Sequence, residues 1–154
     1  MSSLFSLSLT TAILCGAWMI GADAAGLIAW AGFAGCTTFF AAGGKKQGFK
    51  SAICTNISGV FWAMLSIKVS AMLGFPQAGV IMTIVTTFFL CIQSKISLLA
   101  FIPGAFVGSF STFAANGDWM SLIPSLLVGA VLGFLCEWTG NLLYEKWEKK
   151  KKIS

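Results

Sequence analysis

Residues 33–44 read FAGCTTFFAAGG, and residues 106–117 read FVGSFSTFAANG. When Phe33 is aligned with Phe106, six of the twelve positions are identical, and Cys36 and Thr38 are matched by Ser109 and Ser111. Such self-similarity is the mark of an internal repeat. Segments rich in Gly, Ala and Phe also match by chance, so both interpretations stay open at this point.

The composition around these stretches is that of an integral membrane protein. The chain has 154 residues, of which 57% are hydrophobic and 10% are charged. A soluble domain has about 45–50% apolar and about 25% charged residues, and a small fold leaves much of its surface exposed. These values exclude a soluble enzyme, a secreted module and a disordered tail.

Polar or Gly/Pro-rich breaks divide the apolar sequence at 21–23, 43–46, 74–76, 93–95 and 116–118. Because a spanning helix takes about 20 residues, we predict an all-α protein with six transmembrane helices. The predicted spans lie near 4–21, 24–42, 51–73, 77–93, 96–116 and 120–143. They form one domain over 1–143, followed by a lysine-rich cytoplasmic tail at 144–154.

The lysines orient this domain. Six spans put both termini on one side, together with nine of the ten lysines: 45, 46, 50, 95, 146 and 149–152. The positive-inside bias places that side, and both termini, in the cytoplasm. Asp23, Asp118 and Lys68 fall on the other side, where we expect Lys68 to snorkel toward the headgroups.

If the repeat is real, its units are three helices long, at about 1–74 and 75–143. A unit with an odd number of spans re-enters the membrane in the opposite sense. Channels and transporters use such inverted repeats, with the solute site near the midplane between the halves. The alternative is a symmetric bundle with no path through it.

The candidate solute path combines a proline break with hydroxyl and phenyl side chains. Pro103 should kink the fifth span, and Gly104 lets a neighbouring helix approach. We predict a constriction with phenyl gates and a polar cytoplasmic mouth. The constriction would be lined by Thr37, Phe40, Phe106, Ser109, Thr112 and Phe113, and the mouth by Gln93 and Lys95. The alternative is ordinary Phe/Gly packing with locally bonded hydroxyls.

Glu137 is the acid that lies well inside a predicted span. Gly129 and Gly133 precede it at four-residue spacing, and this pattern of small residues marks a helix-contact face. We therefore expect Glu137 to point at protein rather than lipid. Glycine-rich faces of this kind also favour a homo-oligomer.

The sequence offers little for catalysis or cofactors. It has no histidine and no arginine, and its five cysteines are scattered singly through apolar segments. No nucleophile–base pair, metal cluster or phosphate loop is visible, so we predict no enzymatic activity, cofactor or metal. There is no folded basic surface for nucleic acid.

Five stretches resemble the YcdZ-type family of small bacterial inner-membrane proteins. They are LIAWAGFAGCTTFFA (27–41), SGVFWAM (58–64), CIQSK (91–95), IPGAFVGSFSTFA (102–114) and GDWMSLIPSL (117–126). The family is catalogued as a domain of unknown function, so the resemblance implies a multi-span protein of the bacterial inner membrane and carries over no functional residues.

The favoured hypothesis is a passive channel or facilitator in the lipid bilayer for a small neutral or anionic solute. The lack of paired charges or histidines within the spans argues against a proton-coupled pump. The alternative is a non-transporting membrane protein that self-assembles or supports a partner.

Overall fold

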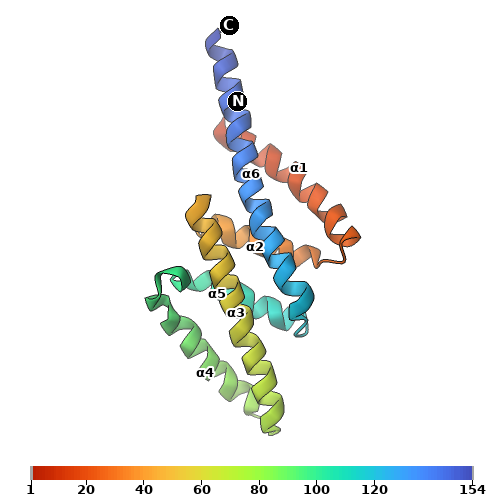
Figure 1. The fold of residues 1–154 in the computed structure, drawn as a ribbon, viewed down its shortest axis with the longest axis vertical. Helices are drawn as coiled ribbons and strands as arrows, with labels where there is room; N and C mark the ends of the chain where they lie inside the picture. Colours follow the sequence, from red (N-terminus) through yellow and green to blue (C-terminus); the bar gives the residue numbers. More distant parts are fainter. Residues whose placement is uncertain (1, 154) are drawn as a thin grey trace.

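The structure is a computed structural model that describes residues 2–153, with side chains as far as Lys151. Six α-helices follow one another in this range, and two short 3₁₀-helices separate the fourth from the fifth (Figure 1). Their bounds are α1 Ser3–Ala24, α2 Ala29–Ala41, α3 Lys45–Leu73, α4 Ala78–Ile92, η1 Gln93–Lys95, η2 Ser97–Leu99, α5 Ile102–Ala114 and α6 Trp119–Ile153. The described residues contain no strand, which confirms the all-α prediction.

Most helices end where the sequence predicts a break. Gly74 ends α3 in the left-handed conformation, with φ of +68°. Gly43 and Gly44 between α2 and α3, and Asn116 and Gly117 between α5 and α6, also have positive φ. Glycine adopts these angles at little cost, so the short turns follow directly from the sequence.

The first predicted break is wrong. Residues 21–23 lie in the last turn of α1, and the chain turns instead at residues 25–28, where Gly26 has φ of +64°. The polar signal of Asp23 therefore belongs to the helix end and not to the turn itself. At the other end of the chain, α6 continues as a helix through the lysine-rich tail to Ile153.

Four helical segments are long and apolar enough to cross a membrane: Ser3–Ala24, Lys45–Leu73, Ala78–Lys95 and Trp119–Lys151. The other two helices, α2 and α5, have 13 residues each. At about 1.5 Å per residue they are about 20 Å long, against a hydrocarbon core of about 30 Å. Helix length therefore accounts for four spans, and the two short helices do not reach across by themselves.

Pro103 begins a helix and does not kink one. α5 starts at Ile102, so Pro103 occupies the first turn, where a backbone N–H has no intrahelical partner to lose. The fifth apolar run is broken earlier, over η1 and η2, and the Ala100 carbonyl accepts the N–H of Ile102 at 3.0 Å. The predicted kink is thus replaced by a helix that starts partway along the run.

The short helices pack crosswise, α2 against α6 and α5 against α3 (Figure 1). Glycines allow both approaches. A Cβ on Gly59 would lie 2.8 Å from the carbonyl carbon of Ala105, and a Cβ on Gly129 would lie 2.7 Å from that of Gly32. Both distances are shorter than real Cβ contacts, so the backbones touch directly.

The two contacts correspond in sequence. Ala105 is the residue that aligns with Gly32 in the repeat, and Gly129 aligns with Gly59 at a slightly smaller offset. A second pair of contacts obeys the same alignment, because Gly35 packs on the backbone of Leu126 and its counterpart Gly108 packs on that of Asn56. The helix α5 also begins and ends at the residues that align with the bounds of α2. Positions that align in the sequence therefore make similar close backbone contacts.

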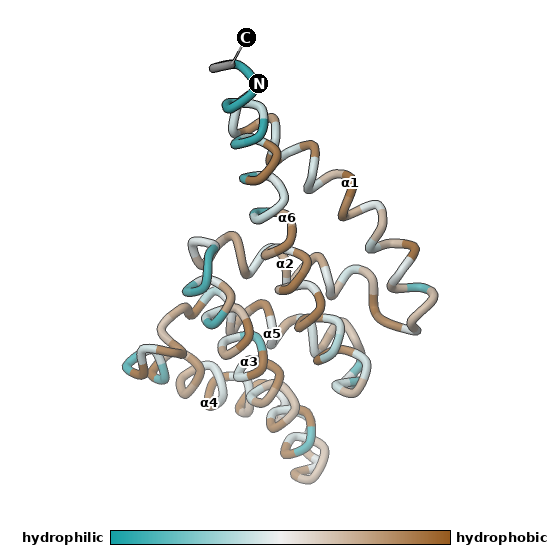
Figure 2. The backbone as a smooth tube through the Cα atoms, turned by 45° about the horizontal axis from the view of Figure 1, so that its top comes forward, coloured by the Kyte–Doolittle hydropathy of each residue, from teal (hydrophilic) through white to brown (hydrophobic). Residues whose placement is uncertain are grey.

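Apolar side chains cover the outside of the helices, as expected for a protein surrounded by lipid. Leu4, Ile20 and Met72 are 74%, 77% and 85% exposed. Hydrophilic residues gather at the helix ends and along the C-terminal end of α6 (Figure 2). The two ends of the described chain lie at the same end of the molecule (Figure 1).

Candidate solute path

A polar cluster lies in the interior, where α2, α3 and α5 meet. Its members are at most 2% exposed, and they are Thr38, Thr55 and Asn56. Gly104 opens α5 to this cluster, since a Cβ there would lie 2.9 Å from Cγ2 of Thr38 and closer still to the Thr55 hydroxyl. The cluster contains no charged group.

Asn56 has unused hydrogen-bonding capacity. The hydroxyl of Thr38 lies 3.1 Å from Oδ1 of Asn56 and 2.9 Å from the Ala34 carbonyl. Nδ2 of Asn56 is buried without a partner. Turning the amide over would let Nδ2 donate to Thr38, whose hydroxyl then donates to Ala34, but Oδ1 would then lack a partner. In either orientation one end of the amide is unpaired, at a cost of about 1–3 kcal/mol.

The helix α5 carries two further buried hydroxyls, those of Ser111 and Thr112. Oγ of Ser111 is fully buried and also has no partner. Thr112 donates its hydroxyl to the Gly108 carbonyl at 2.9 Å, so its hydrogen-bonding need is met within its own helix. Ser111 is the position that aligns with Thr38 when Phe106 is aligned with Phe33.

The predicted path residues of α5 fall on opposite faces of that helix. Gly104 and Thr112 are buried, and Gly104 faces Thr55 of α3. On the other face of α5, Phe106 and Phe113 are 42% and 50% exposed, and Phe110 is exposed as well. Thr37 on α2 is also exposed. The phenyl rings and the buried hydroxyls therefore do not line one cavity inside the chain.

Other predicted path residues lie outside the cluster. Pro103 is exposed and Ser109 is half-buried. Phe40 is also half-buried, with its ring edge-on to Phe39 at a centroid distance of 5.2 Å.

Of the two residues predicted to form the mouth, Gln93 is held by hydrogen bonds to its side-chain oxygen. Oε1 of Gln93 accepts hydrogen bonds from the Ser58 hydroxyl and from Nε1 of Trp62, the latter at 3.0 Å. The Trp62 ring is stacked on Phe89 at 5.4 Å. Nε2 of Gln93 is buried without a partner, while Lys95 is exposed.

Glu137 joins α6 to the start of α3. Its Oε2 accepts the backbone N–H of Lys45 at 2.7 Å, and the preceding residue, Gly44, offers no side chain to cap the helix. The carboxylate therefore caps α3 from another helix, where the helix dipole favours negative charge. Gly129 and Gly133 lie on the same contact face, against Gly32 and Phe39.

Sequence reasoning missed two groupings. Asn56 lies in the middle of an apolar segment, and this position was the available signal for the polar cluster. Cys15, Cys36 and Cys136 come together in a core between α1, α2 and α6, although they are far apart in the chain. The spacing of these cysteines in the sequence does not predict that they lie together.

The comparisons with known proteins agree with the membrane assignment. A family model described as "Protein of unknown function (DUF1097)" matches residues 8–141. The chain is 41% identical over 153 residues to "Inner membrane protein YcdZ" of Salmonella typhimurium, covering 97% of this chain and 94% of that protein. It is 43% identical over 143 residues to the Escherichia coli protein of the same name, covering 91% and 87%.

A third relative is "Uncharacterized protein YahC" of Escherichia coli, which is 31% identical over 162 residues, covering 97% of this chain and 98% of that protein. No solved structure matches. The resemblance drawn from the sequence motifs is confirmed, and multi-pass insertion in the inner membrane is supported by the names of the relatives and by the apolar helices. The chain belongs to the DUF1097 family and is similar to the YcdZ inner-membrane proteins.

Proposed function

We propose that this protein is a passive facilitator for a small, neutral, polar solute in the bacterial inner membrane. The observation that carries the proposal is the buried Asn56 amide with one unpaired end. A fully buried, unpaired polar group calls for an explanation such as an unseen water or ligand. The amide and the neighbouring hydroxyls would exchange hydrogen bonds with a solute that enters the cluster.

The proposal includes an inverted repeat of three helices, with six crossings and both termini in the cytoplasm. The matching glycine contacts in the two halves support it. The short helices would complete their crossings with the flanking non-α segments 25–28 and 93–101. Such backbone is tolerated at membrane depth only inside protein or beside water. The lysine distribution supports the orientation.

The chemistry of the cluster favours neutral solutes. The cluster side chains are two hydroxyls and one amide, so they offer donors and acceptors but no charge to balance an ion. The proposal needs no covalent step and no coupling ion. Lys95 remains at the cytoplasmic end of the path, where it is exposed.

Flux into proteoliposomes tests this path. Stopped-flow light scattering would follow re-swelling after a shock with urea, glycerol or acetamide. We expect Thr38→Val to change the rate for at least one solute, since it removes the hydroxyl that contacts Asn56. Thr83→Val is the matched control, because that hydroxyl is exposed on α4 and bonded to the Gly79 carbonyl. No flux above empty liposomes for any solute would refute the facilitator.

A second candidate function is self-assembly, and the exposed phenyl face of α5 favours it. Phe106, Phe110 and Phe113 are 42%, 56% and 50% exposed on one side of that helix. If copies associate through this face, a path could also lie on the oligomer axis. Phe106→Ala would then lower the oligomer mass in mild detergent and alter any flux, while Thr38→Val would leave the flux unchanged. A monomer at all concentrations would contradict assembly.

A further inference from the structure

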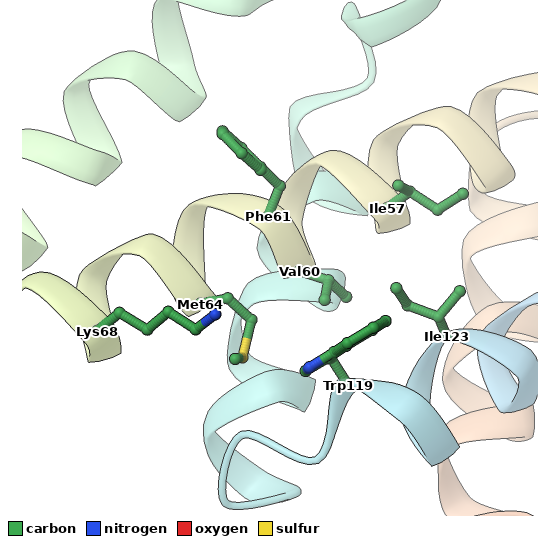
Figure 3. A pocket seen from close by; sticks show the side chains of 7 residues that line it. All are labelled: Ile57, Val60, Phe61, Met64, Lys68, Trp119 and Ile123. Carbon is green, nitrogen blue, oxygen red and sulfur yellow. The ribbon is translucent and has the colours of Figure 1, made fainter.

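An open groove runs along the outside of the molecule between α3 and α6 (Figure 3). It has a volume of about 270 Å³. Val60 and Met64 of α3 and Ile123 of α6 supply apolar lining, and Lys68 and Trp119 supply its nitrogen-bearing side chains. The groove is therefore apolar along its length and carries hydrogen-bond donors.

The donors lie together at one end. Figure 3 shows the Lys68 side chain extended along α3 toward Met64, with the indole nitrogen of Trp119 facing the same side. Lys68 is exposed and lies about three helical turns after Ile57, the residue at the other end of the groove. That separation is about 16 Å along a helix, which is close to half of a hydrocarbon core of about 30 Å.

From this layout we infer that the groove binds an anionic phospholipid, with one acyl chain along the apolar lining and the phosphate at Lys68 and Trp119. Charge complementarity selects this occupant over a neutral lipid, because a lysine near the headgroups attracts anionic lipid by about fivefold in affinity. The neighbouring carboxylate of Asp118 accepts the backbone N–H of Ser121 at 3.2 Å. Asp118 keeps its charge there but does not line the groove, whose charged lining side chain is Lys68.

A second groove of about 280 Å³ repeats this chemistry at the start of α3. Phe49, Val131 and Phe134 line it, with Lys46 and Lys50 as its charged residues. When Gly59 of α3 is aligned with Gly129 of α6, Phe61 and Met64 of the first groove align with Val131 and Phe134 of the second. Assigning the two grooves to opposite leaflets rests on the topology proposed above, whereas lipid binding to the first groove does not.

Quenching of Trp119 by brominated acyl chains tests the inference. The protein would be placed in phosphatidylcholine vesicles that contain increasing fractions of brominated phosphatidylglycerol, or of brominated phosphatidylcholine in a parallel series. The difference between the native chain and the Trp119→Phe variant reports this residue alone. We expect half-maximal quenching at a several-fold lower fraction of phosphatidylglycerol than of phosphatidylcholine.

Two lysine variants complete the design. Lys68→Gln should weaken the preference for phosphatidylglycerol about fivefold, and Lys95→Gln, an exposed lysine outside both grooves, should leave it unchanged. Equal quenching by the two lipids, or an unchanged preference in Lys68→Gln, would overturn the inference. So would the absence of quenching by either lipid, which would mean that protein covers the groove. The readout involves no flux, so it can fail or succeed independently of the proposed function.

Discussion

Replacing Gly59 by alanine adds one methyl group and should destabilise the protein. The added Cβ would lie 2.8 Å from both the carbonyl carbon of Ala105 and the backbone nitrogen of Ser109. It would lie closer still to the Ala105 carbonyl oxygen, and ordinary contact begins at 3.4 Å, so α3 and α5 must separate by more than an ångström at this point. Overpacking costs about 1–3 kcal/mol, against about 1 kcal/mol gained from the higher helix propensity of alanine. We expect a net loss of up to about 2 kcal/mol.

Unfolding in mixed micelles of a mild detergent and SDS measures this loss. Gly79→Ala is the matched control, since a Cβ on that helical glycine meets nothing within 4 Å and should be neutral or stabilising. Gly129→Ala should cost as much as Gly59→Ala, because the equivalent contact with Gly32 is equally close. If Gly59→Ala were as stable as Gly79→Ala, the direct backbone contact between α3 and α5 would be disproved.

Three further predictions concern helix ends. Glu137→Ala should cost about 0.5–2 kcal/mol, because the Lys45 N–H loses its cap; unfolding in the same micelles measures this, and an unchanged midpoint would contradict capping. Hydrogen bonds from the Ser121 hydroxyl and then from its backbone N–H lower the pKa of Asp118. The charged carboxylate therefore stabilises α6 above its ordinary pKa of about 3.9, and this stabilisation is lost as the pH falls. Asp118→Asn should make the unfolding midpoint depend less on pH in that range. Trp18→Phe removes the 2.9 Å hydrogen bond to the Ala29 carbonyl at the start of α2 and should cost about 1 kcal/mol. Trp147→Phe is the control, because Trp147 is exposed near the C-terminus and its replacement should cost nothing measurable.

The sequence predicts the helix order well because turns depend on local chemistry. Gly43, Gly44 and Gly74 adopt positive φ angles, and glycine signals such positions wherever it interrupts an apolar run. The start of α5 was harder to predict. Pro103 is compatible with a kink or with a first turn, and the apolar residues before it contain no cue that separates the two.

The face of each helix could not be predicted, because hydropathy does not distinguish lipid from an apolar core. In α5 the large Phe106 and Phe113 are exposed, while the small Gly104 and Gly108 are buried. Because lipid and the protein interior are both apolar, side-chain size decides which face of a helix packs against protein. The sequence interpretation placed phenyl rings and hydroxyls together in one constriction, and this is where size would have been the better guide.

Long-range partners were beyond any local pattern. Glu137 caps a helix that begins 92 residues earlier, and Asn56 meets Thr38 across two elements. Only the internal similarity between the two halves contained long-range information. It correctly pairs α2 with α5 as helices of equal length, although it does not tell which long helix each one packs against.

The crosswise packing has a consequence for how the chain is made. The helix α2 packs against α6, and a carboxylate of α6 caps the N-terminus of α3. These two contacts of the first half of the chain can therefore form only after α6 has been made. While the protein is being synthesised, the glycine face of α2 and the N–H of Lys45 are without their final partners until the segment around Glu137 has entered the membrane. A truncation of α6 before Glu137 would therefore leave the Lys45 N–H without its cap and would remove part of the helix against which α2 packs.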